Sequence, residues 1–243
     1  MEKAVLWLLF CVVQGALSNY FNKKYQFGLE PQQISVLPSA TSALFCAIQA
    51  VVNPGDEVTV CASSSSLVSS SLLNVHALLQ VVIFEPFFPW YPAIVRNSGG
   101  IPKIVSLDPK TNFKVPSYEE VAKAFSSKTV MCIFNTPHNP TGRVATHDEL
   151  ETVARACIEY DAVCISDEVY ESCVFPKTGR PNMSIALLPG MKERTVTIGS
   201  ASKLLSVTGW RVGWAMSHNT KLLDIVTIMN SFNTFCAPTP LQA

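Results

Sequence analysis

The stretch of sequence that decides the fold is VMCIFNTPHNPTGRVATHDELETVARACIEYDAVCISDEVY, which spans residues 130–170. It contains two short apolar runs, Val130–Phe134 and Ala162–Ser166, which are typical of buried strands. Between these runs, Thr146 and Glu149 have the spacing of a capping box, and apolar side chains follow on one stripe of a helix. A strand, a helix and a second strand in this order predict two parallel strands of one sheet.

The same alternation continues on both sides of this stretch. Helical patterns cover Gly15–Lys24 and Ala43–Val52. Further strands are expected at Ile34–Leu37, from Glu57–Val58 onward, and at Ile101–Val105, Thr195–Ile198 and Val212–Ala215. Short apolar strands that alternate with helices predict an α/β fold with a mostly parallel sheet.

The composition describes an apolar chain without net charge. Of its 243 residues, 48% are hydrophobic and 15% are charged, and the length suits one large α/β domain or two small ones. Lys plus Arg and Asp plus Glu both number 18, so no net field attracts nucleic acid or an anionic membrane. The composition therefore disfavours both as partners.

The cysteines indicate free thiols in a reducing compartment. None forms a CxxC pair, and several lie in apolar runs, which favours buried thiols over a secreted disulfide framework. The eight are Cys11, Cys46, Cys61, Cys132, Cys157, Cys164, Cys173 and Cys236. The histidines show no metal-ligand spacing. This pattern predicts a cytoplasmic protein, with a mitochondrial location as the alternative.

The first residues are compatible with two interpretations. Glu2 and Lys3 precede about ten apolar residues, which resemble the hydrophobic part of a signal peptide. The alternative is the start of a buried helix, and the cysteine pattern favours this alternative. The run is too short to predict a transmembrane helix.

Two loops after predicted strands carry polar side chains. Ligands of open α/β sheets bind beyond the carboxyl ends of the strands, so these positions are candidates for a site. Asn139 lies in a loop rich in proline and glycine, although ordinary turn chemistry also explains that composition. Asp167 follows an apolar strand, where a carboxylate is costly to bury without a cation. The alternative for Asp167 is a helix N-cap.

Three more segments add cations and a loop suited to an anion. Lys203 lies among small and hydroxyl residues after a strand, where a desolvated amine with a lowered pKa can form a Schiff base. Arg211, between two glycines and beside Trp210, suits a fixed anion site. A surface lysine and a surface ion pair are the alternatives. Residues 39–42 open a helix, and their small side chains let backbone N–H groups meet a phosphate.

Together and in this order, these segments resemble the class I/II aminotransferases, which are fold-type I pyridoxal 5'-phosphate (PLP) enzymes. The most specific segments are Asn135–Gly142, Ser166–Tyr170 and Ser200–Arg211. The similarity is closest to the kynurenine/glutamine aminotransferase-like group and covers roughly residues 15–243, apart from a serine-rich patch at 62–73. The resemblance implies a three-layer α/β/α large domain and PLP as the cofactor.

The resemblance also implies a role for each candidate residue. Lys203 forms the internal aldimine with PLP and then moves the proton between substrate Cα and cofactor C4′. Asp167 pairs with the pyridine nitrogen, while Asn139 and Tyr170 hydrogen-bond the phenolic oxygen. The remaining candidates contact the ring face or the phosphate. Phe88 stacks on the ring, and the phosphate contacts are Ser39, Ala40, Thr41, Ser200 and Arg211.

The chain differs from the family in three places. Residues 1–14 form an atypical apolar segment where relatives have a part of the substrate pocket and of the dimer contact. An insertion is expected near residues 59–82, within an incomplete PLP-binding large domain at 15–243. The small C-terminal domain, which holds the arginine for the substrate α-carboxylate in relatives, is expected to be absent.

The function implied is transamination between an amino acid and a 2-oxo acid, by a homodimer when the chain is complete. A PLP-dependent C–S or related lyase shares the same cofactor site and is one alternative. The other is a catalytically silent, truncated chain. A nucleotide-dependent dehydrogenase is disfavoured because no GxGxxG follows any predicted strand.

Overall fold

The computed structural model describes residues 2–52, 79–175 and 183–238, with backbone only for residues 2–11. Its centre is a seven-stranded sheet with the strand order β1-β7-β6-β5-β4-β2-β3. The strands are β1 (Ile34–Leu37), β2 (Gln80–Glu85), β3 (Ile101–Ser106), β4 (Thr129–Asn135), β5 (Val163–Asp167), β6 (Thr195–Ser200) and β7 (Gly213–Met216). β7 runs antiparallel to both of its neighbours, β1 and β6, and the other four strand pairs are parallel. The predicted α/β fold with a mostly parallel sheet is therefore confirmed.

Six of the strands lie where the sequence pattern places them, and one was missed. β2 pairs with both β3 and β4, yet its first residues, Gln80–Val82, fall in the insertion expected near 59–82. The predicted strand at Glu57–Val58 and the rest of that insertion lie outside the described residues, so the insertion stays a prediction. The apolar run of β2 was overlooked because it follows the serine-rich patch without a turn signal.

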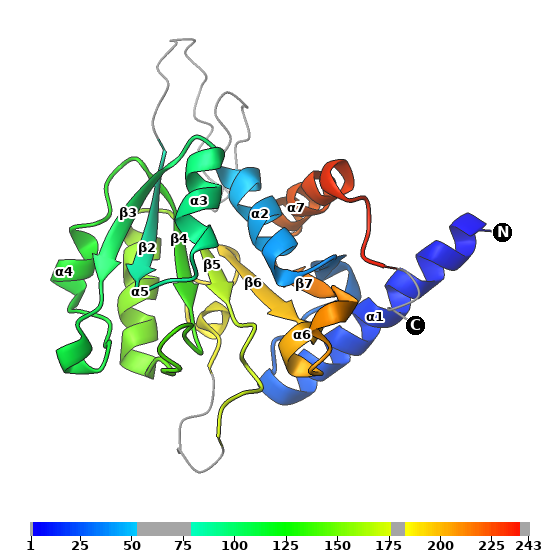
Figure 1. The fold of residues 1–243 in the computed structure, drawn as a ribbon, viewed down its shortest axis with the longest axis horizontal. Helices are drawn as coiled ribbons and strands as arrows, with labels where there is room; N and C mark the ends of the chain where they lie inside the picture. The colour runs from blue at the N-terminus through cyan, green and yellow to red at the C-terminus, as the bar shows by residue number, and fades with distance from the viewer. Residues whose placement is uncertain (1, 53–78, 176–182, 239–243) are drawn as a thin grey trace, which may run out of the picture.

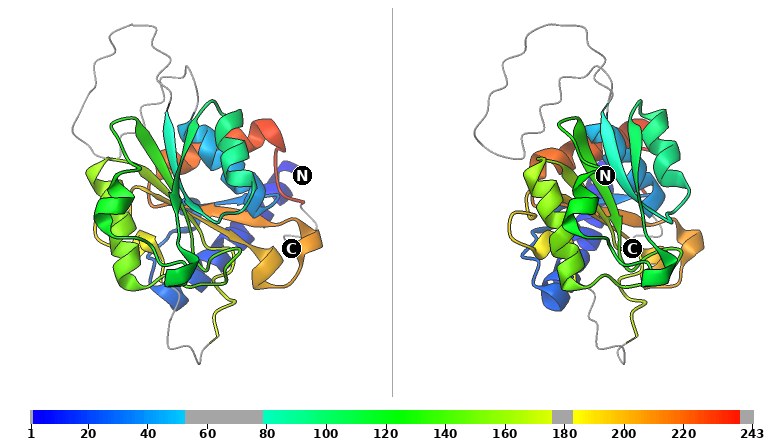
Figure 2. Two further views of the ribbon diagram at one scale, coloured as in Figure 1. Left: turned by 60° about the vertical axis from the view of Figure 1, so that its left-hand side comes forward. Right: turned by 90° about the vertical axis from the view of Figure 1, so that its left-hand side faces the viewer.

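Helices cover both faces of the sheet, as Figures 1 and 2 show. One face packs against α2 (Ala40–Val51), α3 (Trp90–Asn97) and α7 (Thr220–Asn233). The other face packs against α4 (Tyr118–Ala122) and α5 (His147–Glu159) at one side and α1 (Glu2–Tyr25) at the other. This is the three-layer α/β/α arrangement that the resemblance implies.

Apolar side chains that alternate along the strands form a hydrophobic core on each face of the sheet. Ile133 of β4 and Ile165 of β5 face the first helix layer, whereas the adjacent Cys132 and Cys164 face the second. Successive side chains of a strand point to opposite faces, and strands covered on both faces are apolar throughout. The capping box predicted at Thr146 is present at the start of α5.

The first helix is longer than predicted. α1 runs from Glu2 to Tyr25 without a break at residues 14–15, where the sequence suggests a boundary between segments. Its buried residues Leu17 and Phe21 pack against Val36 and Trp214 of the sheet. No helix in the described part of the chain is long and apolar enough to cross a membrane.

Four of the six cysteines among the described residues are buried free thiols, as predicted. Cys173 is exposed and Cys236 is partly exposed. The buried four are Cys46, Cys132, Cys157 and Cys164.

Four short 3₁₀ turns lie in the connections between these helices and strands. They are η1 (Pro31–Gln33), η2 (Pro109–Thr111), η4 (Ile185–Leu187) and η5 (Thr208–Trp210). A four-residue helix, α6 (Ala201–Leu204), follows β6 directly.

Candidate active site

A cavity of about 200 Å³ lies at the carboxyl ends of the central parallel strands. Asn135, Asp167 and Ser200, the last residues of β4, β5 and β6, are all part of its wall. The structure brings all ten candidate residues to this one cavity: Ser39, Ala40, Thr41, Phe88, Asn139, Asp167, Tyr170, Ser200, Lys203 and Arg211. Their meeting follows from topology, because the carboxyl ends of parallel strands share one edge of the sheet.

Asp167 is the buried acid of the cavity, with 4% of its surface exposed. Tyr91 Oη donates a hydrogen bond of 2.5 Å to Oδ2, and the Val169 N–H donates one of 3.3 Å to Oδ1. Burial raises the pKa of Asp167, and these two hydrogen bonds oppose that rise. A turn follows Asp167, so the alternative of a helix N-cap is wrong.

Lys203 and Arg211 are the basic residues of the cavity wall. Lys203 lies in α6, and its Nζ is 5.4 Å from the centre of the Tyr170 ring. The sequence led us to expect a desolvated amine, whereas the structure leaves Lys203 exposed. The reason is local, because α6 is only four residues long and buries Ala201 and Ser202 instead.

Two helix N-termini contribute to the cavity wall. Ser39 caps α2 by accepting a hydrogen bond of 3.0 Å from the Ser42 N–H. Ser200 caps α6 in the same way, with its Oγ 3.1 Å from the Ser202 nitrogen. The first N–H groups of a helix lack partners within the helix, and the helix dipole favours negative charge there. The α2 end therefore suits an anion such as a phosphate. At α6, the Ala201 and Ser202 N–H groups already donate to the Val212 carbonyl and to Ser200 Oγ.

Gly213 allows the α2 end to reach this position. A Cβ atom on Gly213 would lie 2.3 Å from the carbonyl carbon of Ser39 and 2.4 Å from the nitrogen of Ala40. Both contacts are with backbone, which cannot rotate away. The loop before α2 thus packs directly on the backbone of β7.

Arg211 adds a positive charge beside these N–H groups. Its backbone is left-handed, with φ 55°, and its Nη1 donates a hydrogen bond of 3.3 Å to the carbonyl of Thr208. Within the described ranges, no acidic side chain forms an ion pair with it. The alternative of a surface ion pair therefore lacks a partner in this part of the chain, and the guanidinium has N–H groups left for an anion.

The loop after β4 is tied to the end of β5. The Asn139 N–H donates a hydrogen bond of 2.6 Å to Asn135 Oδ1. Asn135 Nδ2 in turn donates one of 2.8 Å to the carbonyl of Asp167. The Asn135 side chain therefore connects the backbone of Asn139 to the backbone of Asp167 and fixes their relative positions.

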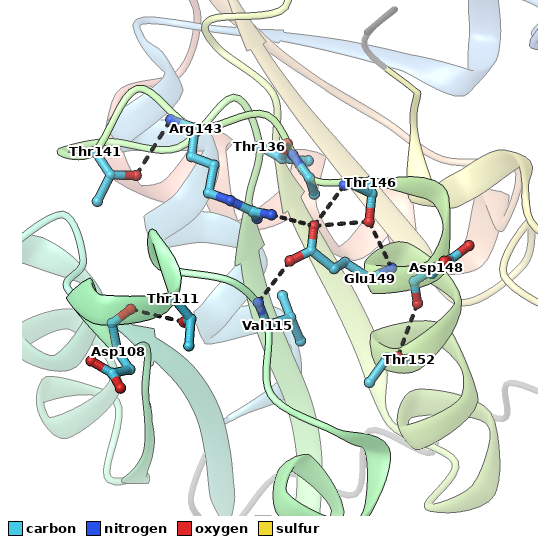
Figure 3. Close-up of polar contacts among 11 residues, drawn as sticks. Asp108, Thr111, Val115, Thr136, Thr141, Arg143, Thr146, Asp148, Glu149 and Thr152 are labelled. Atoms are coloured by element: carbon cyan, nitrogen blue, oxygen red, sulfur yellow. Dashed lines mark hydrogen bonds and ion pairs between the residues drawn. The ribbon is translucent and has the colours of Figure 1, made fainter.

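The far end of this loop is held by Glu149, as Figure 3 shows. Its carboxylate accepts hydrogen bonds of 2.8 Å from Arg143 Nη2 and from the N–H groups of Val115 and Thr146. Burial would raise the pKa of Glu149, but the hydrogen bonds from Arg143, Thr146 and Val115 outweigh it and lower the pKa. One carboxylate thus connects the start of α5 to two loops.

Several wall residues were not singled out from the sequence. Tyr91 is the most informative, because its hydroxyl contacts Asp167; the aromatic cluster at residues 87–91 was noticed, but only Phe88 was selected from it. Tyr91 and Asn135 also line a second cavity of about 20 Å³, which has room for about one water. The others in the large cavity are Leu44, Asn135, Val169, Ser202 and Thr208.

Comparison with known proteins identifies a family. The family model described as "Aminotransferase class I and II" matches residues 61–243. Kynurenine–oxoglutarate transaminase 3 of Mus musculus is 42% identical over 239 residues, which cover 94% of this chain and 46% of that protein. Kynurenine–oxoglutarate transaminase 1 of Homo sapiens is 36% identical, with 93% and 50% covered. The chain spans about half the length of the curated relatives it matches.

Solved structures show the same fold. N-Succinyldiaminopimelate aminotransferase from Mycobacterium tuberculosis superposes with a TM-score of 0.81 at 28% identity, over 95% of this chain and 53% of that one. Aspartate aminotransferase from Thermus thermophilus with maleate superposes with a TM-score of 0.78 at 28% identity, over 95% and 52%.

Proposed function

Because the chain belongs to the family of class I and II aminotransferases, we propose that it binds PLP and transfers an amino group between an amino acid and a 2-oxo acid. One observation carries this proposal: Lys203, Asp167 and the N-terminus of α2 line one cavity. An amine, a buried acid and an anion cradle in one cavity match the three chemical parts of PLP, its aldehyde, its ring nitrogen and its phosphate.

The donor set suits each part of the cofactor. The phosphate would lie at the N-terminus of α2, with Ser200 and Arg211 beside it. Asp167 has no cationic partner among the described residues, and a protonated ring nitrogen would supply one. Asn139 and Tyr170 would donate to the phenolic oxygen, and Phe88 would cover a face of the ring. The residues present therefore fit the group.

The division of labour follows from the chemistry. When bound, PLP supplies a conjugated cationic ring that acts as an electron sink for a carbanion. Asp167 would keep the ring nitrogen protonated. Burial raises the pKa of Asp167, and pairing with the cationic ring nitrogen would lower that pKa again. Lys203 Nζ holds the cofactor and then takes the proton from the substrate Cα, for which it must be neutral. Its place near Tyr170 keeps the amine at the cavity wall.

The names of the relatives suggest which substrates to test first. Because these relatives are kynurenine–oxoglutarate transaminases, kynurenine is the first amino donor to test and oxoglutarate the first acceptor.

The decisive experiment measures cofactor binding by Lys203. The full chain is titrated with PLP, reduced with borohydride and analysed by mass for a covalent adduct. We expect an adduct in the wild type and none in Lys203→Ala. Lys128→Ala is the matched control, because Lys128 is exposed and precedes β4, at the opposite edge of the sheet. Equal labelling of all three proteins would refute the proposed site, and binding without turnover would favour the silent chain.

We also propose that the chain assembles as a homodimer and works in the cytoplasm. Exposed apolar side chains beside the cavity, Leu205 and Trp210, support the first proposal. The buried free thiols support the second. Sedimentation and cell fractionation test them.

A further inference from the structure

A buried carboxylate outside the cavity wall connects α1 to the cavity. Glu171 has 5% of its surface exposed and follows Tyr170 directly. Its Oε1 accepts a hydrogen bond of 2.8 Å from Tyr20, and its Oε2 accepts one of 2.6 Å from Lys24 Nζ. Tyr25 also donates to Oε2. Three donors from the last two turns of one helix thus converge on one carboxylate from a distant loop.

The donors form a connected group rather than three separate contacts. Lys24 Nζ donates a second hydrogen bond, of 2.8 Å, to Tyr20 Oη, and it lies 4.9 Å from the centre of the Tyr25 ring. Burial, together with the Glu171 carboxylate, raises the pKa of Tyr20 and of Tyr25. Both phenols therefore remain protonated and can donate at neutral pH.

The backbone transmits this anchoring to the cavity wall. The Glu171 N–H donates a hydrogen bond of 2.9 Å to the carbonyl of Glu168, and the Cys173 N–H donates one of 2.8 Å to the carbonyl of Tyr170. These bonds close two tight turns around Tyr170. A shift of Glu171 therefore moves Tyr170, whose ring lies under the Lys203 amine.

The part of α1 that contacts Glu171 is itself packed against the sheet. Phe21, one residue after Tyr20, is buried and packs edge-on against Trp214, with ring centres 6.2 Å apart. α1 is therefore a rigid support for Glu171, because packed interiors do not deform easily.

We propose that Glu171 is a positioning residue that fixes the Tyr170 ring against α1, and so sets how Tyr170 contacts the cofactor. The inference rests on the proposed function, since it concerns the same cavity. Glu171 does not line the cavity, so it acts on the bound group only through Tyr170. Without this anchor, the turn is free to move and the Tyr170 hydroxyl no longer donates at a fixed place.

The test compares Glu171→Gln with Glu159→Gln in the full chain. Glu159 is the matched control, because it also accepts a hydrogen bond from a tyrosine, Tyr118, but does so on the exposed surface of α5. We expect Glu171→Gln to bind PLP about tenfold more weakly, in keeping with the loss of a charged hydrogen-bond network. Glu159→Gln should bind PLP like the wild type.

The absorbance of bound PLP, followed against pH, distinguishes positioning from mere support of the fold. With the cofactor held by Lys203 Nζ, a donor to the phenolic oxygen would draw electron density from Nζ, and loss of that donor would make Nζ more basic. We expect the midpoint of the absorbance change to rise by about half a pH unit or more in Glu171→Gln, which corresponds to an altered hydrogen bond of modest strength. Wild-type affinity and an unshifted midpoint in Glu171→Gln would overturn the proposal.

Tyr25→Phe keeps the experiment decisive if Glu171→Gln does not fold. It retains the carboxylate with Tyr20 and Lys24 as donors, and should weaken PLP binding about threefold with a smaller midpoint shift in the same direction. A wild-type result for Tyr25→Phe would then sink the idea. If the wild type itself forms no adduct through Lys203, the proposed function fails as well. If the adduct forms but substitution of Glu171 does not affect it, only the positioning role fails.

Discussion

At the scale of single residues, the anion cradle depends on the absence of a side chain at Gly213. The backbone of Ser39 and Ala40 lies where a Cβ of residue 213 would be. Gly209, in the same segment, has no atom within 4 Å of the corresponding position. The two glycines therefore form a matched pair in which only one is sterically required.

We expect Gly213→Ala to displace the loop before α2 and to weaken PLP binding about tenfold, with a loss of roughly 1–3 kcal/mol in unfolding free energy from overpacking. Gly209→Ala should change both quantities little. PLP titration and denaturant unfolding of the two variants measure these effects. Equal behaviour of the two would show that the cradle adapts to a methyl group.

At the scale of elements, Glu149 joins the first turn of α5 to the loop that carries Asn139. Its carboxylate is nearly buried and accepts hydrogen bonds from Arg143 Nη2 and from two backbone N–H groups (Figure 3). Removing the charge leaves the buried Arg143 without its partner, which is more costly than the loss of an average hydrogen bond.

Glu149→Gln should therefore lower the unfolding free energy by about 3 kcal/mol near pH 7. Glu151→Gln, on the exposed face of the same helix, should change it by less than about 0.5 kcal/mol. The folded-state pKa of Glu149 is lowered from 4.5, so its stabilisation is present above pH 4.5 and is lost as the pH falls through the lowered value. The difference between Glu149→Gln and wild type, measured by chemical unfolding, should shrink under acidic conditions.

At the scale of the whole molecule, stability against pH depends on Glu168, a buried acid without a cationic partner among the described residues. Its Oε1 accepts hydrogen bonds from Ser166 and Ser184, of 2.8 Å and 2.6 Å. Burial raises its pKa from 4.5 to about 7, and the two serine hydroxyls oppose the rise. The folded state thus favours the protonated acid.

The sign of the pH dependence follows from this shift. Below pH 4.5 the acid is protonated in both states, and stability is lost as the pH rises from there through about 7. Glu168→Gln mimics the protonated acid, so its stability relative to wild type should increase between pH 5 and pH 8 by roughly 2–3 kcal/mol, at about 1.4 kcal/mol per pKa unit. Glu193 is exposed, so the unfolding free energy of Glu193→Gln relative to wild type should be the same at both pH values. Denaturant unfolding at each pH measures the two differences. A flat difference for Glu168→Gln would contradict the shift.

The sequence by itself determined six of the seven described strands, the capping box at Thr146 and ten of the sixteen residues of the cavity wall. These features depend on local periodicity and on the residues that follow each strand. Both can be identified in the sequence without knowledge of tertiary contacts. Lys203 was predicted as a member of the wall but not as an exposed one, because exposure depends on what packs around α6.

Only the tertiary structure decided which distant groups meet. Tyr91 reaches Asp167 across 76 residues, and Tyr20 reaches Glu171 across 151. The antiparallel direction of β7 and the membership of Gln80–Val82 in β2 were settled in the same way, by pairing with strands far along the chain. The physical reason is that hydrogen bonds and packing between remote segments follow from strand order and helix placement, and no local pattern of residues encodes either.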